Sequence, residues 1–201
     1  MHVSRCRKLK SIQALGHLRK LKRVDVYQCA EIEEFPSLEH LTTLWWLGVS
    51  GCSKLKTIQG LEHLTKLQWL LVRDLAEIEE LPALENLWSL AVVRCPKFKC
   101  MQGLEHFRNL RVLSVEECAE IEELRGVEHL MSLRTLNVTY CPKLQWRGRA
   151  LEQLRQRLKG GFSYVKESKM KRLWSAICGA SECEGDRKTK KMKRVGSNFN
   201  I

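Results

Sequence analysis

Residues 44–52 read LWWLGVSGC, and their frame, LxxLxVxxC, decides the fold because it returns along the chain with a fixed step. Four further full copies also end in cysteine, the copy at residues 67–75 ends in leucine, and a clipped copy ends at Cys6. The full copies are spaced by 23, 23, 20, 23 and 23 residues, with first leucines at Leu21, Leu44, Leu67, Leu87, Leu110 and Leu133. A fixed step of this length, built on LxxLxL, is typical of units that stack into a solenoid.

Within one unit, Leu47 and Val49 alternate with other residues and are expected to point inward from a short strand. After Cys52 the sequence SKLKTI predicts a descending segment, and GLEHLTKL, with its leucines at helical spacing, predicts a return arm. A single unit cannot bury these side chains, whereas stacked units form a continuous core. The sequence therefore predicts an α/β solenoid, a leucine-rich repeat with a parallel β-sheet on the concave face and about seven repeats of ~23 residues.

The expected domain boundaries follow the decay of the frame after Cys141. Residues 1–159 are predicted to form the repeat domain, with a C-terminal amphipathic cap helix at residues 151–159 that Gly160 and Gly161 end. Residues 160–201 are predicted to form a basic, largely disordered tail. Residues 1–6 supply only the end of a strand, which indicates a raw edge or the C-terminal part of a longer protein.

The net charge of +12 is unevenly distributed. Residues 1–144 hold 20 Lys and Arg against 18 Asp and Glu, whereas residues 145–201 hold 15 against 5. Nucleic-acid binding is therefore expected only through the tail, whose run at residues 187–194 is also typical of nuclear targeting. No apolar run reaches the roughly 18 residues of a membrane span. The nine cysteines and the lack of an apolar signal segment favour a cytoplasmic protein, with the nucleus as the alternative.

Charged residues alternate in sign from one repeat to the next. The clearest column reads Lys8, Glu31, Lys54, Glu77, Lys97, Glu120 and Lys143. Stacked strands lie about 5 Å apart, so each lysine is expected beside glutamates of the adjacent repeats. Because exposed ion pairs contribute little energy but penalise a slip by one repeat, this column is interpreted as register control.

Two further columns contain possible metal ligands. The cysteine column has leucine at position 75, and zinc ligands usually come in closely spaced pairs, so packing is favoured over a metal or a disulfide. The histidine column has amide residues in register and is interpreted as a polar convex row: His17, His40, His63, His106 and His129. No nucleophilic triad or phosphate loop is present, so no enzymatic activity, cofactor or metal is predicted.

The outward residues of the predicted strands place aromatic side chains together on the concave face. Exposed tryptophan and tyrosine beside arginine are typical of binding hot spots, although bulky residues can also shield a sheet from a neighbouring domain. Trp45 and Trp88 are expected at the edge of this patch. The predicted partner-binding residues are Tyr27, Trp46, Trp69, Leu71, Arg73 and Val93.

The phrases LGVSGCSKLKTIQGLEHL and AEIEELPALE closely resemble C-terminal leucine-rich repeats of plant intracellular nucleotide-binding disease-resistance proteins, most of all the class with an N-terminal TIR domain. The resemblance covers residues 1–158. It implies a protein-recognition module that senses pathogen effectors and restrains the receptor's own nucleotide-binding domain. The TIR and nucleotide-binding domains are absent from this sequence, so signalling and nucleotide hydrolysis are not implied. The alternatives are a nuclear or nucleic-acid-associated scaffold acting through the basic tail, and a substrate adaptor of a ubiquitin ligase.

Overall fold

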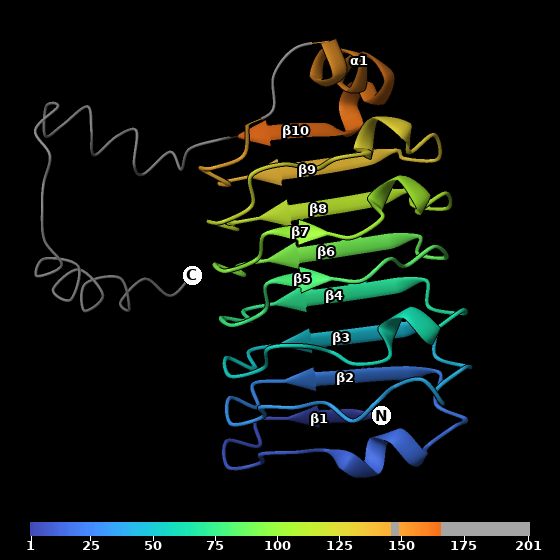
Figure 1. The fold of residues 1–201 in the computed structure, drawn as a ribbon, viewed down its shortest axis with the longest axis vertical. Coiled ribbons are helices and arrows are strands. Elements are labelled where there is room, and N and C mark those ends of the chain that lie inside the picture. The colour runs from blue at the N-terminus through green and yellow to red at the C-terminus, as the bar shows by residue number, and fades with distance from the viewer. Residues whose placement is uncertain (146–148, 166–201) are drawn as a thin grey trace, which may run out of the picture. The chain divides into compact units, whose positions relative to one another are not determined.

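The computed structural model describes residues 1–145 and 149–165, and its main feature is one parallel sheet with the strand order β1-β2-β3-β4-β6-β8-β9-β10 (Figure 1). The strands are β1 (His2–Ser4), β2 (Arg23–Tyr27), β3 (Trp46–Ser50), β4 (Trp69–Arg73), β6 (Ser89–Val93), β8 (Val112–Glu116), β9 (Thr135–Thr139) and β10 (Phe162–Val165). The predicted leucine-rich-repeat solenoid is therefore confirmed. None of the helices in the described part of the chain combines the length and apolarity that a membrane span needs.

The register of the sheet is the one that the sequence frame predicts. Trp46 lies opposite Arg23 on β2 and opposite Trp69 on β4, so equivalent positions of successive repeats are direct neighbours. The inward residues Leu47 and Val49 are fully buried, and one apolar core extends through all the repeats. Each period of the sequence thus adds one strand and one layer of core.

The turn after each strand has the same backbone geometry in every repeat. The residue before the cysteine column has a φ between 52° and 69°: Arg5, Gln28, Gly51, Asp74, Arg94, Glu117 and Tyr140. Six of these seven are not glycine, the residue that adopts this conformation most easily. The turn is instead held by its N–H, which donates to the carbonyl at the end of the next strand over 2.6–3.0 Å.

Four of the return arms contain short 3₁₀ helices in place of the longer helical segment that the leucine spacing suggests. Three of them follow a glycine with positive φ: η2 (Leu61–His63), η3 (Leu104–His106) and η4 (Val127–His129). The first repeat has η1 (Gln13–His17) without such a glycine. A Cβ atom on Gly60 would lie 2.7 Å from the amide nitrogen of Glu39, so close packing of adjacent arms requires glycine there.

The repeat with the 20-residue step differs from the others on its convex side. Its β5 (Glu80–Leu81) pairs with β7 (Cys100–Met101) of the next repeat in a small second sheet. Between β5 and β6 it buries Leu84 and Leu87, whereas the next repeat buries three residues between β7 and β8, namely Leu104, Phe107 and Leu110. Phe98 and Phe107 of that next repeat are the largest fully buried side chains of the core. Their volume is expected to compensate for the missing residue.

The C-terminal end of the described solenoid is formed by α1 (Arg149–Leu158), η5 (Lys159–Gly161) and β10. Helix α1 lies against η4 and buries Leu154 and Leu158. The guanidinium of Arg157 donates to the carbonyl oxygens of Glu128 and Leu130, at 3.1 and 3.2 Å. Carbonyl groups of the last return arm therefore receive donors from the helix.

The sequence placed the end of the repeat domain at residue 159, whereas the sheet continues through β10. Phe162 pairs with Leu136, and the N–H of Tyr140 donates to the carbonyl of Val165 over 2.6 Å. Gly161 permits this return because a Cβ atom there would lie only 2.0 Å from the carbonyl oxygen of Arg134. The strand FSYV lacks the LxxLxV frame, so the repeat pattern alone does not predict it. The remainder of the predicted tail, residues 166–201, lies outside the described residues.

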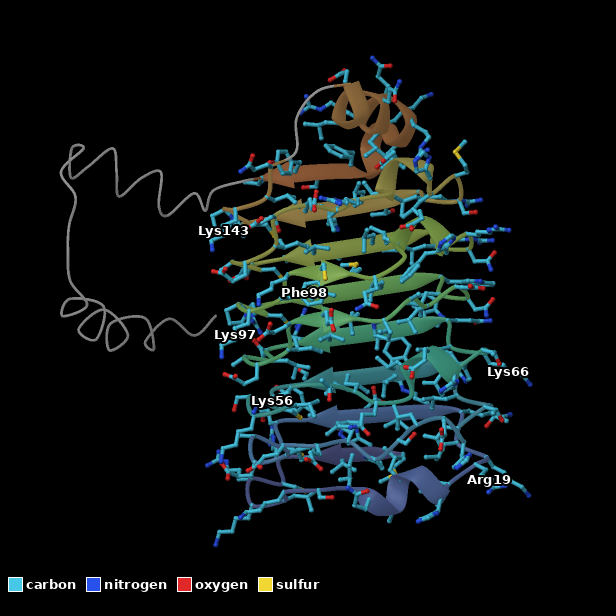
Figure 2. The ribbon with its side chains drawn as sticks, viewed as in Figure 1. Arg19, Lys56, Lys66, Lys97, Phe98 and Lys143 are labelled. Atoms are coloured by element: carbon cyan, nitrogen blue, oxygen red, sulfur yellow. The ribbon has the colours of Figure 1, made fainter. Side chains whose placement is uncertain are left out.

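The column of alternating charges forms ion pairs between adjacent repeats along one edge of the sheet, where Figure 2 shows Lys97 and Lys143. Three of the four lysines in the column contact a glutamate of the preceding repeat within 2.5–2.7 Å: Lys54–Glu31, Lys97–Glu77 and Lys143–Glu120. A neighbouring column adds Lys99–Glu79 at 2.6 Å. The expected pairing with a glutamate of the preceding repeat is confirmed for these lysines, whereas none of them forms an ion pair with the following repeat within the described residues.

The substitution Lys54→Glu is expected to lower the melting temperature by about 1–3 °C, because it places three acidic residues in succession. Combining it with Glu31→Lys and Glu77→Lys restores the alternation and should recover most of the loss. Thermal unfolding followed by circular dichroism measures both variants. A triple variant no more stable than the single one would show that these columns do not interact.

Candidate protein-binding site

Two tryptophans of adjacent strands form the centre of the concave face. The rings of Trp46 on β3 and Trp69 on β4 have centroids 5.9 Å apart and an interplanar angle of 30°. Trp45 stands edge-on to Trp46 with a centroid distance of 6.3 Å. Trp46 is half-buried, whereas Trp45 and Trp69 are each 37% exposed, so the three rings form one aromatic surface open to solvent.

Polar neighbours on β2 hold the ring of Trp46 in place. The guanidinium of Arg23 lies 4.4 Å from the ring centroid, and the indole Nε1–H donates to Oδ1 of Asp25 over 2.8 Å. Arg23 Nε also donates to Oδ2 of Asp25 over 2.7 Å. Because these contacts restrict the rotation of the indole, Trp46 can bind a partner with little loss of conformational entropy.

Two further features support this arrangement. Gly48 leaves room for the hydrogen bond, since a Cβ atom there would lie 3.0 Å from Oδ1 of Asp25 and 3.4 Å from Nε1 of Trp46. Partial burial acts to raise the pKa of Asp25, but the hydrogen bonds from Arg23 and Trp46 outweigh it and the pKa is lowered. Asp25 therefore remains ionised at neutral pH and stays an acceptor for both donors.

The structure brings the predicted site residues to one face, with one exception. Tyr27 is 40% exposed, Arg73 is exposed and Leu71 is half-buried beside the tryptophans. The expectation that Val93 contributes to the open surface is wrong, because its side chain is only 5% exposed. Val93 lies between Arg73 of β4 and Glu116 of β8 in the sheet register, and these longer side chains flank it. We call the remaining five the concave aromatic patch, namely Tyr27, Trp46, Trp69, Leu71 and Arg73.

Sequence reasoning did not assign roles to Arg23, Asp25 and Gly48. A signal for them was present, since an arginine and an aspartate occupy alternate outward positions of the strand beside Trp46. In this register Asp25 also lies opposite Gly48, the position without a side chain to separate it from the indole.

The cysteine column belongs to the core. Each thiol lies 3.4–3.9 Å from the carbonyl oxygen two residues earlier, and the equivalent Leu75 is fully buried as well. Burial raises the pKa of Cys52 and of Cys95 to about 11, so both remain protonated at neutral pH, whereas metal binding requires the thiolate. Within the described ranges, no three His, Cys, Asp or Glu side chains are grouped so that they could hold a metal ion.

The substitution Cys52→Ser is expected to lower the free energy of unfolding by about 1–3 kcal/mol, because it buries a hydroxyl where the core requires an apolar group. Urea unfolding followed by circular dichroism measures the loss. The matched control is Cys100→Ser, which changes an exposed cysteine and should have little effect. Zinc detected by elemental analysis of the pure protein would contradict the packing interpretation.

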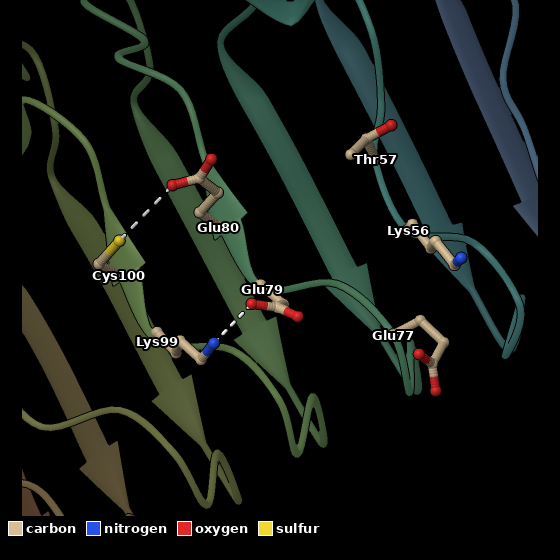
Figure 3. A pocket seen from close by; sticks show the side chains of 7 residues that line it. All are labelled: Lys56, Thr57, Glu77, Glu79, Glu80, Lys99 and Cys100. Carbon is tan, nitrogen blue, oxygen red and sulfur yellow. Dashed lines mark hydrogen bonds and ion pairs between the residues drawn. The ribbon is translucent and has the colours of Figure 1, made fainter.

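A shallow pocket at the shortened repeat is lined by charged side chains and one thiol, as Figure 3 shows. Lys99 pairs with Glu79, and Sγ of Cys100 lies 4.0 Å from Oε2 of Glu80. Burial, together with the charge of Glu80, raises the pKa of Cys100. A nucleophilic cysteine needs a lowered pKa, so this arrangement favours the unreactive thiol. The lining residues are Lys56, Thr57, Glu77, Glu79, Glu80, Lys99 and Cys100.

Comparison with known proteins gives a family and a fold. The family profile described as "Plant disease resistance protein RPS2-like, leucine-rich repeats" matches residues 14–142. Among solved structures, the leucine-rich repeat domain of the type III effector XCV3220 (XopL) superposes with a TM-score of 0.67 at 18% sequence identity, over 86% of this chain. The chain spans 64% of the length of that structure, and at this identity the likeness concerns the fold alone. No curated protein matches the sequence.

Proposed function

Since the chain belongs to the RPS2-like leucine-rich-repeat family of plant disease resistance proteins, we propose that it recognises a protein partner through the concave aromatic patch. The leucine-rich repeats of such proteins form protein-interaction scaffolds. The observation that carries the proposal is the pair of Trp46 and Trp69, whose rings lie 5.9 Å apart on an open face. Large aromatic side chains that are already held in position contribute most of the binding energy in many interfaces.

The proposed partner is a pathogen effector or the nucleotide-binding domain of the same receptor. The first would make the chain the sensing part of a defence response, and the second would make it an autoinhibitory part. The GLEHL arms and the cysteine-ended strands support the TIR-type class of receptor. On this proposal the protein acts in the cytoplasm, with the nucleus as the alternative.

Truncation after residue 167 tests this function against the nucleic-acid alternative, because Met1–Glu167 form one compact unit that includes β10. We would immobilise the full chain and the truncated chain, and measure binding of effectors, of nucleotide-binding domains from TIR-type receptors, and of DNA. Equal binding of one protein partner by both chains is the expected result. If only DNA binds, and only to the full chain, the basic tail is the functional element and the proposal is wrong.

A further inference from the structure

The turns that lead into the strands carry a second surface with a distinct character. We call it the ascending edge, and it comprises residues 19–22, 42–45, 65–68, 85–88, 108–111 and 131–134. Glu85 is its one acidic residue. Figure 2 shows Arg19 and Lys66 along this side of the sheet, opposite the side of Lys97 and Lys143. Seven exposed basic residues lie on this edge, namely Arg19, Lys20, Lys22, Lys66, Arg108, Arg111 and Arg134.

The basic side chains of the ascending edge are not engaged in ion pairs within the described residues. None of its basic side chains forms an ion pair with another residue of the described ranges, whereas four lysines of the opposite edge, Lys54, Lys97, Lys99 and Lys143, pair with glutamates. The glutamates of the adjacent return arms do not pair with these basic side chains. Glu62 and Glu105, for example, each lie 3.6 Å from the histidine that follows them in the chain. The ascending edge is thus a cationic strip available to an anionic partner.

Tryptophans are interspersed with these cations. Trp45 and Trp88 on this edge are 37% and 39% exposed, and the guanidinium of Arg111 lies 4.8 Å from the ring centroid of Trp88. An arginine stacked on an indole has its orientation restricted, while its N–H groups remain free to donate to a carboxylate in a bidentate manner. Arginine and tryptophan together are also the residues most enriched at the centres of protein interfaces.

We infer that the ascending edge binds an acidic segment of a protein partner. Single-stranded nucleic acid would need open aromatic faces on which bases stack. Here the guanidinium of Arg111 covers one face of Trp88. A carboxylate instead accepts hydrogen bonds from the free N–H groups of the arginine and leaves the guanidinium stacked on the indole. The inference is independent of the concave aromatic patch, because it uses none of the five residues of that patch.

The test measures binding of a fluorescein-labelled decaglutamate peptide to the full chain by fluorescence anisotropy in 0.1 M NaCl. An extended segment of ten residues spans about 33 Å, and the six strands behind the edge span about 24 Å. The variant Lys22→Gln/Arg111→Gln/Arg134→Gln removes three charges from the edge. The matched control Arg7→Gln/Lys8→Gln/Lys10→Gln removes three exposed charges, likewise without ion-pair partners in the described ranges, from the opposite side of the repeats.

The edge variant should bind the peptide at least about tenfold more weakly than the unmodified chain, and the control should lose less than about threefold. Equal losses in the two variants would mean that only net charge matters, and no loss in the edge variant would mean that the peptide binds elsewhere. Both results overturn the inference. A ten-nucleotide oligothymidylate is measured in parallel, and if it binds more tightly than the peptide and is lost in the edge variant, the ligand is nucleic acid.

Discussion

The substitution Phe107→Ala is expected to lower the free energy of unfolding by about 3–5 kcal/mol, the usual cost of deleting a fully buried aromatic side chain. Phe107 is completely buried and lies next to the repeat that has one buried residue fewer on its convex side. Other return arms carry leucine at the equivalent position, for example Leu64 and Leu130. Collapse of the neighbouring repeat around the cavity would be limited, because that repeat has less material with which to fill it.

The conservative substitution Phe107→Leu separates this explanation from an ordinary core effect. It introduces the residue that other repeats accept, yet it should still cost about 1 kcal/mol or more, since the space beside the shortened repeat then stays partly empty. Urea unfolding of both variants, followed by far-UV circular dichroism, gives the two values. A neutral Phe107→Leu variant would show that the phenylalanine does not compensate for the missing residue.

Truncation of Trp69 to alanine is expected to weaken binding of the protein partner by at least about 2 kcal/mol, or roughly thirtyfold, the usual threshold of a hot spot. The same loss is expected for Trp46→Ala, because each ring is one half of the tryptophan pair. Both side chains point away from the core, so far-UV circular dichroism should show an unchanged fold.

The controls for this series are His63→Ala and His106→Ala, which change exposed side chains on the return arms, away from the sheet. Affinities of the partner for all four variants, measured by surface plasmon resonance, should separate the two faces. Equal losses from both faces, or none from the tryptophans, would exclude the concave aromatic patch as the binding surface.

The repeat frame was sufficient to predict which residues become neighbours across the sheet. Trp46 and Trp69 occupy the same position of successive repeats, and in a parallel stack such positions pair directly. The burial of the cysteine column could also be predicted, because Leu75 in the same column indicates that this position takes an apolar side chain. Such predictions need only counting along the chain, since every repeat has the same geometry.

Features that depend on side-chain length or on the end of the array could not be predicted in this way. Val93 is outward by alternation, yet Arg73 and Glu116 on the flanking strands leave it only 5% exposed. Strand β10 is identified only by its pairing with β9 in the structure, because its sequence has no repeat frame. Trp46 is held by Asp25 through a hydrogen bond whose geometry depends on the rotamers of both residues.

The shortened repeat leaves the sheet undisturbed. Trp69 pairs with Ser89 across it in the same register in which Trp46 pairs with Trp69 across a full-length repeat. The difference between a step of 23 and a step of 20 residues is taken up entirely between the strands. An in-frame deletion in this gene region can therefore shorten the segments between the strands without misaligning the outward residues of the sheet that select a partner. Changes in length and changes in specificity are separable in such an array, so new recognition surfaces can arise on frameworks that differ in length.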